Sequence, residues 1–219
     1  MRTRLVLTAA VLSSAAALAC GALAAQSAAP TASPGAAPAA APAPDAKVQM
    51  KAEMDAYAKL AMPGEHHQRL ASLAGKWKVT GKAWMVPGQP PMEMSSTGEA
   101  SWILGGRYLQ EIHTGSFMGQ PFEGRALDGY DNATHEYFST WVDNMGTGVE
   151  VFRGKCDDPC NVLTETAEFV DPMSGKMVQT RSVITFVDKD TYRQEMYLVG
   201  AGPGGQDVKQ MEFTAKRER

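Results

Sequence analysis

The sequence predicts a mainly β protein, an antiparallel up-and-down β-barrel of about ten strands that follows one or two short N-terminal helices. Two observations support this prediction. From Trp77 onward the hydrophobic period changes from 3.6 residues to 2, which is typical of half-buried strands. Turn-forming segments rich in Gly, Pro, Asn and Asp then recur at hairpin spacing. Because every connection is short, a closed barrel is favoured over a sandwich, which needs longer crossings.

Composition limits the function more than it defines it. The chain has 219 residues, of which 44% are hydrophobic and 21% charged, as in ordinary globular proteins. Its 21 Lys and Arg against 24 Asp and Glu argue against a nucleic-acid partner. No phosphate-binding loop, dinucleotide fingerprint, HExxH or nucleophile elbow occurs. The sequence therefore predicts no catalytic residue, no metal site and no cofactor.

The N-terminus predicts export. Arg2 and Arg4 precede an apolar run from Leu5 to Ala25, which is the pattern of a secretory signal peptide over residues 1–25. The run is mostly Ala and Ser, so a transmembrane span is not expected. Cys20 follows a small residue and offers a rival interpretation, a lipid anchor. We expect a periplasmic or secreted protein, with a lipoprotein as the alternative.

Two helices are expected before the first strand. Residues 26–45 are almost all Ala, Pro, Ser and Thr and predict a spacer. Asp45 can cap a helix over 46–62, which Pro63 ends. The apolar residues of this helix recur at helical spacing: Met50, Met54, Tyr57 and Ala61.

The second helix leads into the predicted barrel domain, residues 63–219. It is expected from about Glu65 to Ala74, with Gly75 in the left-handed conformation after it. The first strand begins at Trp77, and further strands are expected near 93–104, 106–114, 121–130, 135–143, 147–155, 161–170, 176–187, 191–199 and 207–217. Residues 115–121 join two of these strands and are interpreted as an ordinary loop or as a portal lid.

The first and last predicted strands carry a tryptophan and an arginine that occur together in a known class of barrels. Gly75-Lys76-Trp77 on the first strand, with Arg217 on the last, is similar to the signature of the lipocalin-like (calycin) barrels. That resemblance implies that the arginine packs across the tryptophan. A barrel of about ten strands is also wide enough to hold a small ligand.

Longer motifs narrow the resemblance. The region from about 63 to 217 resembles the DUF1579 family, which has no assigned activity. The resemblance therefore implies a lipocalin-like barrel and carries no catalytic residue onto this chain. The motifs are Pro-Gly-Glu-His-His from Pro63, Gly-Gly-Arg-Tyr-Leu-Gln from Gly105, Met-Gly-Gln-Pro-Phe-Glu-Gly from Met118, Gly-Tyr-Asp-Asn from Gly129 and Ser-Thr-Trp-Val-Asp-Asn-Met-Gly-Thr-Gly from Ser139.

The cysteines and histidines are interpreted as structural. Cys156 and Cys160 are the two thiols left once Cys20 is cleaved away or acylated, so an exported domain favours a disulfide between them. The alternative is a redox pair, but active dithiols usually have two intervening residues. His66 and His67 are adjacent on a helix, so their rings diverge; His66 is expected to cap the barrel floor.

Polar residues on the strands are the candidate ligand site. On strand 135–143, Tyr137 shares a face with Trp141 and Asp143, while later strands offer Arg181 and Glu195. A buried carboxylate must be paired, which suggests Arg181 with Asp143 or Glu195. The alternative is a structural ion pair, and a one-residue change of register would invert these faces.

Three functions are compatible with these residues. The favoured one is an exported barrel that binds a small, partly apolar molecule against Trp141 and polar lumen residues. An isomerase or hydrolase using Asp143, Arg181 and Glu195 is the second. The third is a structural domain with a solid core, held on the Ala/Pro spacer.

Overall fold

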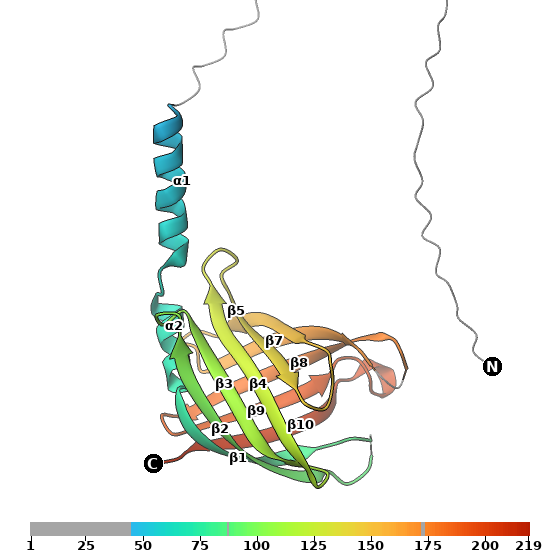
Figure 1. Ribbon diagram of the computed structural model, residues 1–219. Helices are drawn as coiled ribbons and strands as arrows, with labels where there is room; N and C mark the ends of the chain where they lie inside the picture. Colours follow the sequence, from blue (N-terminus) through green and yellow to red (C-terminus); the bar gives the residue numbers. More distant parts are fainter. Residues whose placement is uncertain (1–44, 87, 172–173) are drawn as a thin grey trace, which may run out of the picture. The chain divides into compact units, whose positions relative to one another are not determined.

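The computed structural model describes residues 45–86, 88–171 and 174–219, and Figure 1 shows their arrangement. The predicted signal peptide, 1–25, and all but the last residue of the predicted spacer, 26–45, lie outside the described residues. Three helical segments come first: α1 (Ala46–Ala61), α2 (Glu65–Arg69) and the 3-10 turn η1 (Leu70–Ser72). The strands are β1 (Gly75–Ala83), β2 (Met92–Ile103), β3 (Tyr108–Phe117), β4 (Gln120–Asp131), β5 (Glu136–Asp143), β6 (Glu150–Cys156), β7 (Val162–Val170), β8 (Met177–Asp188), β9 (Thr191–Leu198) and β10 (Val208–Arg217), with the 3-10 turn η2 (Pro203–Gly205) before the last.

The sheet closes on itself. Each strand pairs antiparallel with its neighbours in sequence, and β1 also pairs with β10, where Trp77 lies opposite Arg217. Closure leaves no free sheet edge and gives every strand one face toward the lumen and one toward solvent. The prediction of an up-and-down barrel of ten strands is confirmed.

One end of the barrel is covered by the chain that leads into it. Leu70 and Leu73, from η1 and the residue after it, are 2% and 5% exposed. They pack in one core cluster with Trp77 and Val79 of β1 and Leu109 of β3. Antiparallel order places the β6–β7 connection at this same end, and we call it the closed end. The connections β1–β2, β3–β4 and β5–β6 lie at the other end, which we call the rim (Figure 1).

The segment 115–121 is neither a lid nor a loose loop. β3 continues to Phe117 and β4 begins at Gln120, and these two residues are paired in the ladder. Only Met118 and Gly119 lie between them, both with positive φ, at 51° and 77°. Two such residues make the turn that matches the twist of a tight hairpin. The portal-lid interpretation is therefore wrong, because the strands themselves occupy this segment.

Helix α1 forms as predicted but does not join the core. The side chain of Asp45 accepts a hydrogen bond from the Lys47 amide at 2.9 Å, and the helix ends ahead of Pro63. None of its residues is buried, and Met50 and Met54 of the apolar stripe are 63% and 65% exposed. Within the described residues, no helix has both the length and the apolar character needed to cross a bilayer.

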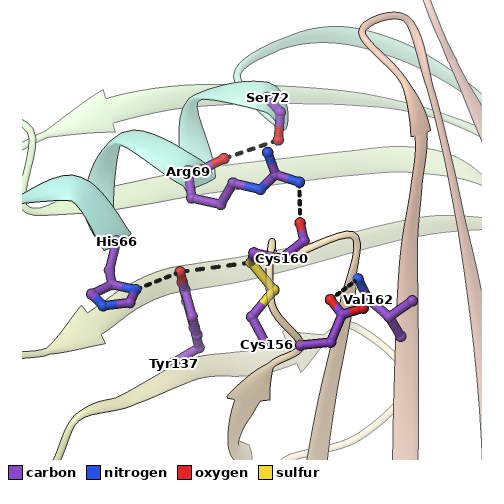
Figure 2. Close-up of a disulfide and its surroundings, with 8 residues drawn as sticks. His66, Arg69, Ser72, Tyr137, Cys156, Cys160 and Val162 are labelled. Atoms are coloured by element: carbon purple, nitrogen blue, oxygen red, sulfur yellow. Dashed lines mark hydrogen bonds between the residues drawn. A yellow bond between two sulfur atoms is a disulfide. The ribbon is translucent and has the colours of Figure 1, made fainter.

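A disulfide fastens the closed end, as Figure 2 shows. Cys156 and Cys160 are bonded, which confirms the predicted pairing. The Arg69 guanidinium of α2 donates to the carbonyl of Cys160. The Tyr137 hydroxyl lies 3.1 Å from His66 Nδ1 and 3.8 Å from Cys160 Sγ. The ring of His66 also stacks on Tyr130 with centroids 4.1 Å apart, but His66 is exposed, and His67, at 5% exposed, is the histidine buried at the barrel floor.

The first and last strands are tied by Trp77 and Arg217. The guanidinium lies over the indole, 4.2 Å from the ring centroid, which is the contact that the lipocalin-like resemblance implies. Arg217 also donates to the Ser72 carbonyl at 2.8 Å. Gly75 makes room for it: φ is 122°, and a Cβ there would lie 2.5 Å from Nη1 of Arg217. The Arg217 side chain therefore holds β10 both to β1 and to the helical segment η1.

Candidate ligand-binding site

The barrel encloses a cavity of about 400 Å³. It extends from Leu73 at the closed end to Met145 at the rim, so it follows the barrel axis. Its lining is mainly apolar, and the large side chains gather toward the rim. The apolar lining near the rim includes Ala83, Met94, Phe117, Phe122, Met145, Met196 and Met211.

Trp141 and Asp143 lie together on the cavity wall. Trp141 Nε1 donates to Asp143 Oδ2 at 2.9 Å, while Asp143 Oδ1 accepts from the Met145 amide at 2.9 Å. The indole is seated against Gly124, where a Cβ would come within 2.4 Å of the ring. The Asp143 carboxylate therefore fixes the orientation of the indole.

Deeper in the lumen, three carboxyl groups face one another across strands β3, β4 and β7: Glu111, Asp128 and Glu165. We call these the acidic cluster. Burial, then the charges of Glu111 and Glu165 and a hydrogen bond with Glu111, raise the pKa of Asp128 well above its usual range. Burial raises the pKa of Glu165 to about 7, although Ser139 donates to its Oε2 at 3.3 Å. Asp128 and Glu165 therefore hold protons at a pH where exposed carboxyl groups have lost them.

The acidic cluster has few basic partners. His113 Nε2 lies 2.8 Å from Glu111 Oε2, and both side chains line the cavity. Tyr192 faces the same space from β9; burial, and then the charges of Glu111 and Asp128, raise its pKa. Among the described residues that line the cavity there is no Lys or Arg.

A further carboxyl group with a raised pKa, that of Glu150, lies nearer the rim. Glu150 lines the cavity at the start of β6, and burial and the charge of Asp143 raise its pKa. No group of three or more His, Cys, Asp or Glu within the described residues is arranged to hold a metal ion. The lumen is thus acidic along its length, with an apolar lining around the carboxyl groups.

The model of the family described as "Protein of unknown function (DUF1579)" matches residues 62–217, well over half of the chain. The chain belongs to the DUF1579 family. No curated protein matches it.

Solved structures resemble the DUF1579 barrel in fold. The crystal structure of Rv2717c from M. tuberculosis aligns with a TM-score of 0.52 and 14% identity, over 72% of this chain and 100% of that one. A redesigned β-barrel aligns with a TM-score of 0.35 and 11% identity, over 68% of this chain and 94% of that one. At 14% identity the first likeness shows the barrel fold alone, and the second is too distant to support an argument.

Two of the five predicted site residues lie on the outer wall of the DUF1579 barrel. Arg181 neighbours Ser182, which lines the cavity, so alternation turns Arg181 outward, where it pairs with Asp207 at 2.6 Å. Glu195 is likewise turned out and pairs with Lys209. The expected pairing of Arg181 with Asp143 or Glu195 is therefore wrong.

The other three predicted residues divide between two places. Trp141 and Asp143 line the cavity together. Tyr137 is on the same inner face of β5 but is buried at the closed end, where its hydroxyl meets His66 and Cys160, and it does not line the cavity. Burial is the main cause that raises its pKa. Tyr137 therefore belongs to the floor of the DUF1579 barrel.

The sequence reasoning missed the acidic cluster. Its signal is the alternation on β7, where Glu165 stands between Leu163 and Ala167, and all three are buried. Leu109, which is fully buried, marks the inner face of β3 two residues before Glu111 in the same way. A carboxylate flanked at i−2 and i+2 by core residues on a strand is thus a readable sign of a lumen charge.

Proposed function

We propose that this protein is an exported barrel that binds a small, partly apolar molecule in its lumen. The observation that carries the proposal is the cavity of about 400 Å³, with a mostly apolar lining and polar groups at separate points of its wall. Ligand sites generally have this character, a concave apolar surface with a few placed polar groups. A barrel with a solid core would fill this space with side chains.

Two features support export. Arg2, Arg4 and the apolar run to Ala25 have the pattern of a signal peptide. The disulfide between Cys156 and Cys160 is the kind of bond that persists in oxidising compartments. The proposed location is therefore the periplasm or the cell exterior, and a lipid anchor at Cys20 is the alternative form of the exported protein.

The enzyme alternative has less support than binding. It depended on Asp143, Arg181 and Glu195 acting together, but Arg181 and Glu195 are engaged in ion pairs on the outer wall. Asp143 remains in the lumen, where it accepts a hydrogen bond from Trp141. That contact positions an aromatic surface, which is a binding role.

Native mass spectrometry of the protein purified from its own host tests the proposal. We expect a retained small molecule, released on denaturation. Ala126→Phe fills part of the cavity from its β4 wall and should abolish retention. Val142→Phe is the matched control, because Val142 is 39% exposed and pairs with Arg125 on the outer face. Absence of any retained molecule, or equal retention by both variants, would refute lumen binding.

A further inference from the structure

The lumen has an imbalance of charge. Five carboxyl groups face it from five consecutive strands, β3 to β7: Glu111, Asp128, Asp143, Glu150 and Glu165. The described lining residues contain no Lys or Arg. Arg69 at the closed end donates to the carbonyl of Cys160 instead. Among the described lining residues the one basic side chain is His113, which is engaged with Glu111.

Asp128 marks the point where a basic donor is missing. Its side chain lines the cavity and is deeply buried, its hydrogen bond is with another carboxyl group, Glu111, and no donor among the described residues reaches Oδ2. Leaving a buried polar atom unsatisfied is costly, and more so for a group that can carry charge. An acceptor held in this way against a cavity is a natural place for a donor from a ligand.

We propose that the lumen ligand is an organic cation, a protonated amine on an apolar body, with its ammonium group among Glu111, Asp128 and Glu165. This inference rests on the proposed binding function and names the chemical class of its ligand. An ammonium group offers three N–H donors and no acceptor, which complements a set of carboxylate oxygens. The apolar body would lie toward the rim, along Met94, Phe122 and Met211.

The surrounding contacts fit this orientation of the ligand. Ser139 already donates to Glu165, and His113 contacts Glu111, so both carboxylates are held in place by the wall. Trp141 offers an aromatic surface, whose face attracts a cation that passes it. A carboxylate or phosphate ligand would instead meet a lining rich in carboxyl groups, in which the described residues include no Lys or Arg to pair with it.

Binding a cation should displace a proton. In the empty lumen Asp128 keeps a proton, since burial and the neighbouring carboxyl group of Glu111 raise its pKa. When the ammonium group enters, that proton leaves to the solvent and the carboxylate formed pairs with the ligand. The titratable groups that face Asp128 are Glu111 and His113 of β3, Glu165 of β7 and Tyr192 of β9.

Three probes with the same apolar body test the head-group preference: 4-phenylbutylamine, 4-phenylbutanol and 4-phenylbutyrate, each titrated calorimetrically into the ligand-free protein. We expect the amine to bind at least about tenfold more tightly than the alcohol, and the carboxylate more weakly than either. Titrations near pH 6 in buffers of different ionisation enthalpy should show proton release with the amine and none with the alcohol.

Two isosteric substitutions locate the effect. Asp128→Asn and Glu165→Gln should each weaken amine binding about tenfold while leaving alcohol binding unchanged. Glu195→Gln is the control, since Glu195 lies on the outer wall with Lys209. Equal affinity for amine and alcohol would overturn the cation inference and leave lumen binding intact. Failure of all three probes to bind would count against both proposals. If a variant does not fold, the three probes titrated into the unaltered protein still test the cation inference.

Discussion

At the scale of single residues, the balance between burial and compensation decides what a carboxyl group does. Glu165 and Glu195 are both glutamates on strands of one barrel. Glu165 is 2% exposed and receives one hydrogen bond, from Ser139, and burial raises its pKa to about 7. The hydrogen bond from Lys209 lowers the pKa of Glu195. The strand face on which each glutamate lies therefore decides whether its pKa is raised, as for Glu165, or lowered, as for Glu195.

The raised pKa of Glu165 predicts a pH dependence of stability. Its ordinary value is 4.5, so between about pH 4.5 and 7 the folded state keeps a proton that the unfolded chain has lost. The folded state is then favoured less as pH rises, by about 3 kcal/mol over the whole window. Glu165→Gln should match the parent protein near pH 4 and be more stable at pH 8, by urea unfolding. Glu195→Gln should not gain stability at high pH, and parallel pH profiles for parent and Glu165→Gln would contradict the assignment.

At the scale of elements, the barrel depends on ties between segments distant in sequence. Arg217 of β10 contacts the indole of Trp77 on β1 and donates to the carbonyl of Ser72 in η1. The disulfide and Tyr137 perform the same task between the β6–β7 connection and α2. Both ties converge on the closed end, which explains why that end is packed while the cavity extends to the rim.

The tie between β1 and β10 predicts energetic coupling. Trp77→Ala should cost about 3–5 kcal/mol because it removes a large core side chain. The cation–π contact with Arg217 should contribute about 1–2 kcal/mol of coupling, since it is partly desolvated. A double-mutant cycle of Trp77→Phe and Arg217→Ala, measured by urea unfolding, gives the coupling directly. Additive effects would mean that the contact contributes nothing to closure.

The disulfide predicts a smaller effect. It closes a short loop, so the chain-entropy model gives about 2 kcal/mol of stabilisation. The Cys156→Ser and Cys160→Ser double variant should lose that amount and keep the barrel fold. The parent protein should resist alkylation under denaturing, non-reducing conditions. Labelling of both thiols under those conditions would show that the bond is absent.

At the scale of the whole molecule, the chain joins a ten-strand barrel to an N-terminal helix whose apolar residues are exposed. Export is proposed from the preceding sequence, and the disulfide in a domain that already has a closed sheet and a continuous core is consistent with that proposal. The barrel and its cavity are thus expected to operate in an oxidising compartment.

The export prediction is tested by intact mass. Protein from the cell envelope of its own host should begin at or near Ala25, because the n-region, apolar run and small residues before that position fit signal cleavage. A diacylated N-terminus at Cys20 would support the lipoprotein alternative. An envelope species that retains Met1 would contradict both forms of processing.

The fold was predictable from the sequence because each strand needs only a local signal. Alternation from Trp77 onward, together with turn residues at hairpin spacing, predicted the ten strands, and most of their ends agree with the structure within one to three residues. The family motifs between 63 and 217 agree with the family match over 62–217. The tight turn at Met118 and Gly119 was missed because positive φ at a methionine has no marker in the sequence.

The site was predictable only in part, because the register between strands decides which side chains point into the lumen. On β8 both faces mix polar and apolar residues, and the small polar Thr180 and Ser182 are the ones buried, at 1% and 2% exposed, which turns Arg181 outward. A change of one residue in register would exchange these faces without altering the local pattern. The sequence by itself determined the strands, their order and the disulfide, and the resemblance to lipocalin-like barrels supplied the contact that closes the barrel. Only the tertiary structure decided which carboxyl groups share the lumen, because they come from β3, β4 and β7 and meet only when the sheet closes.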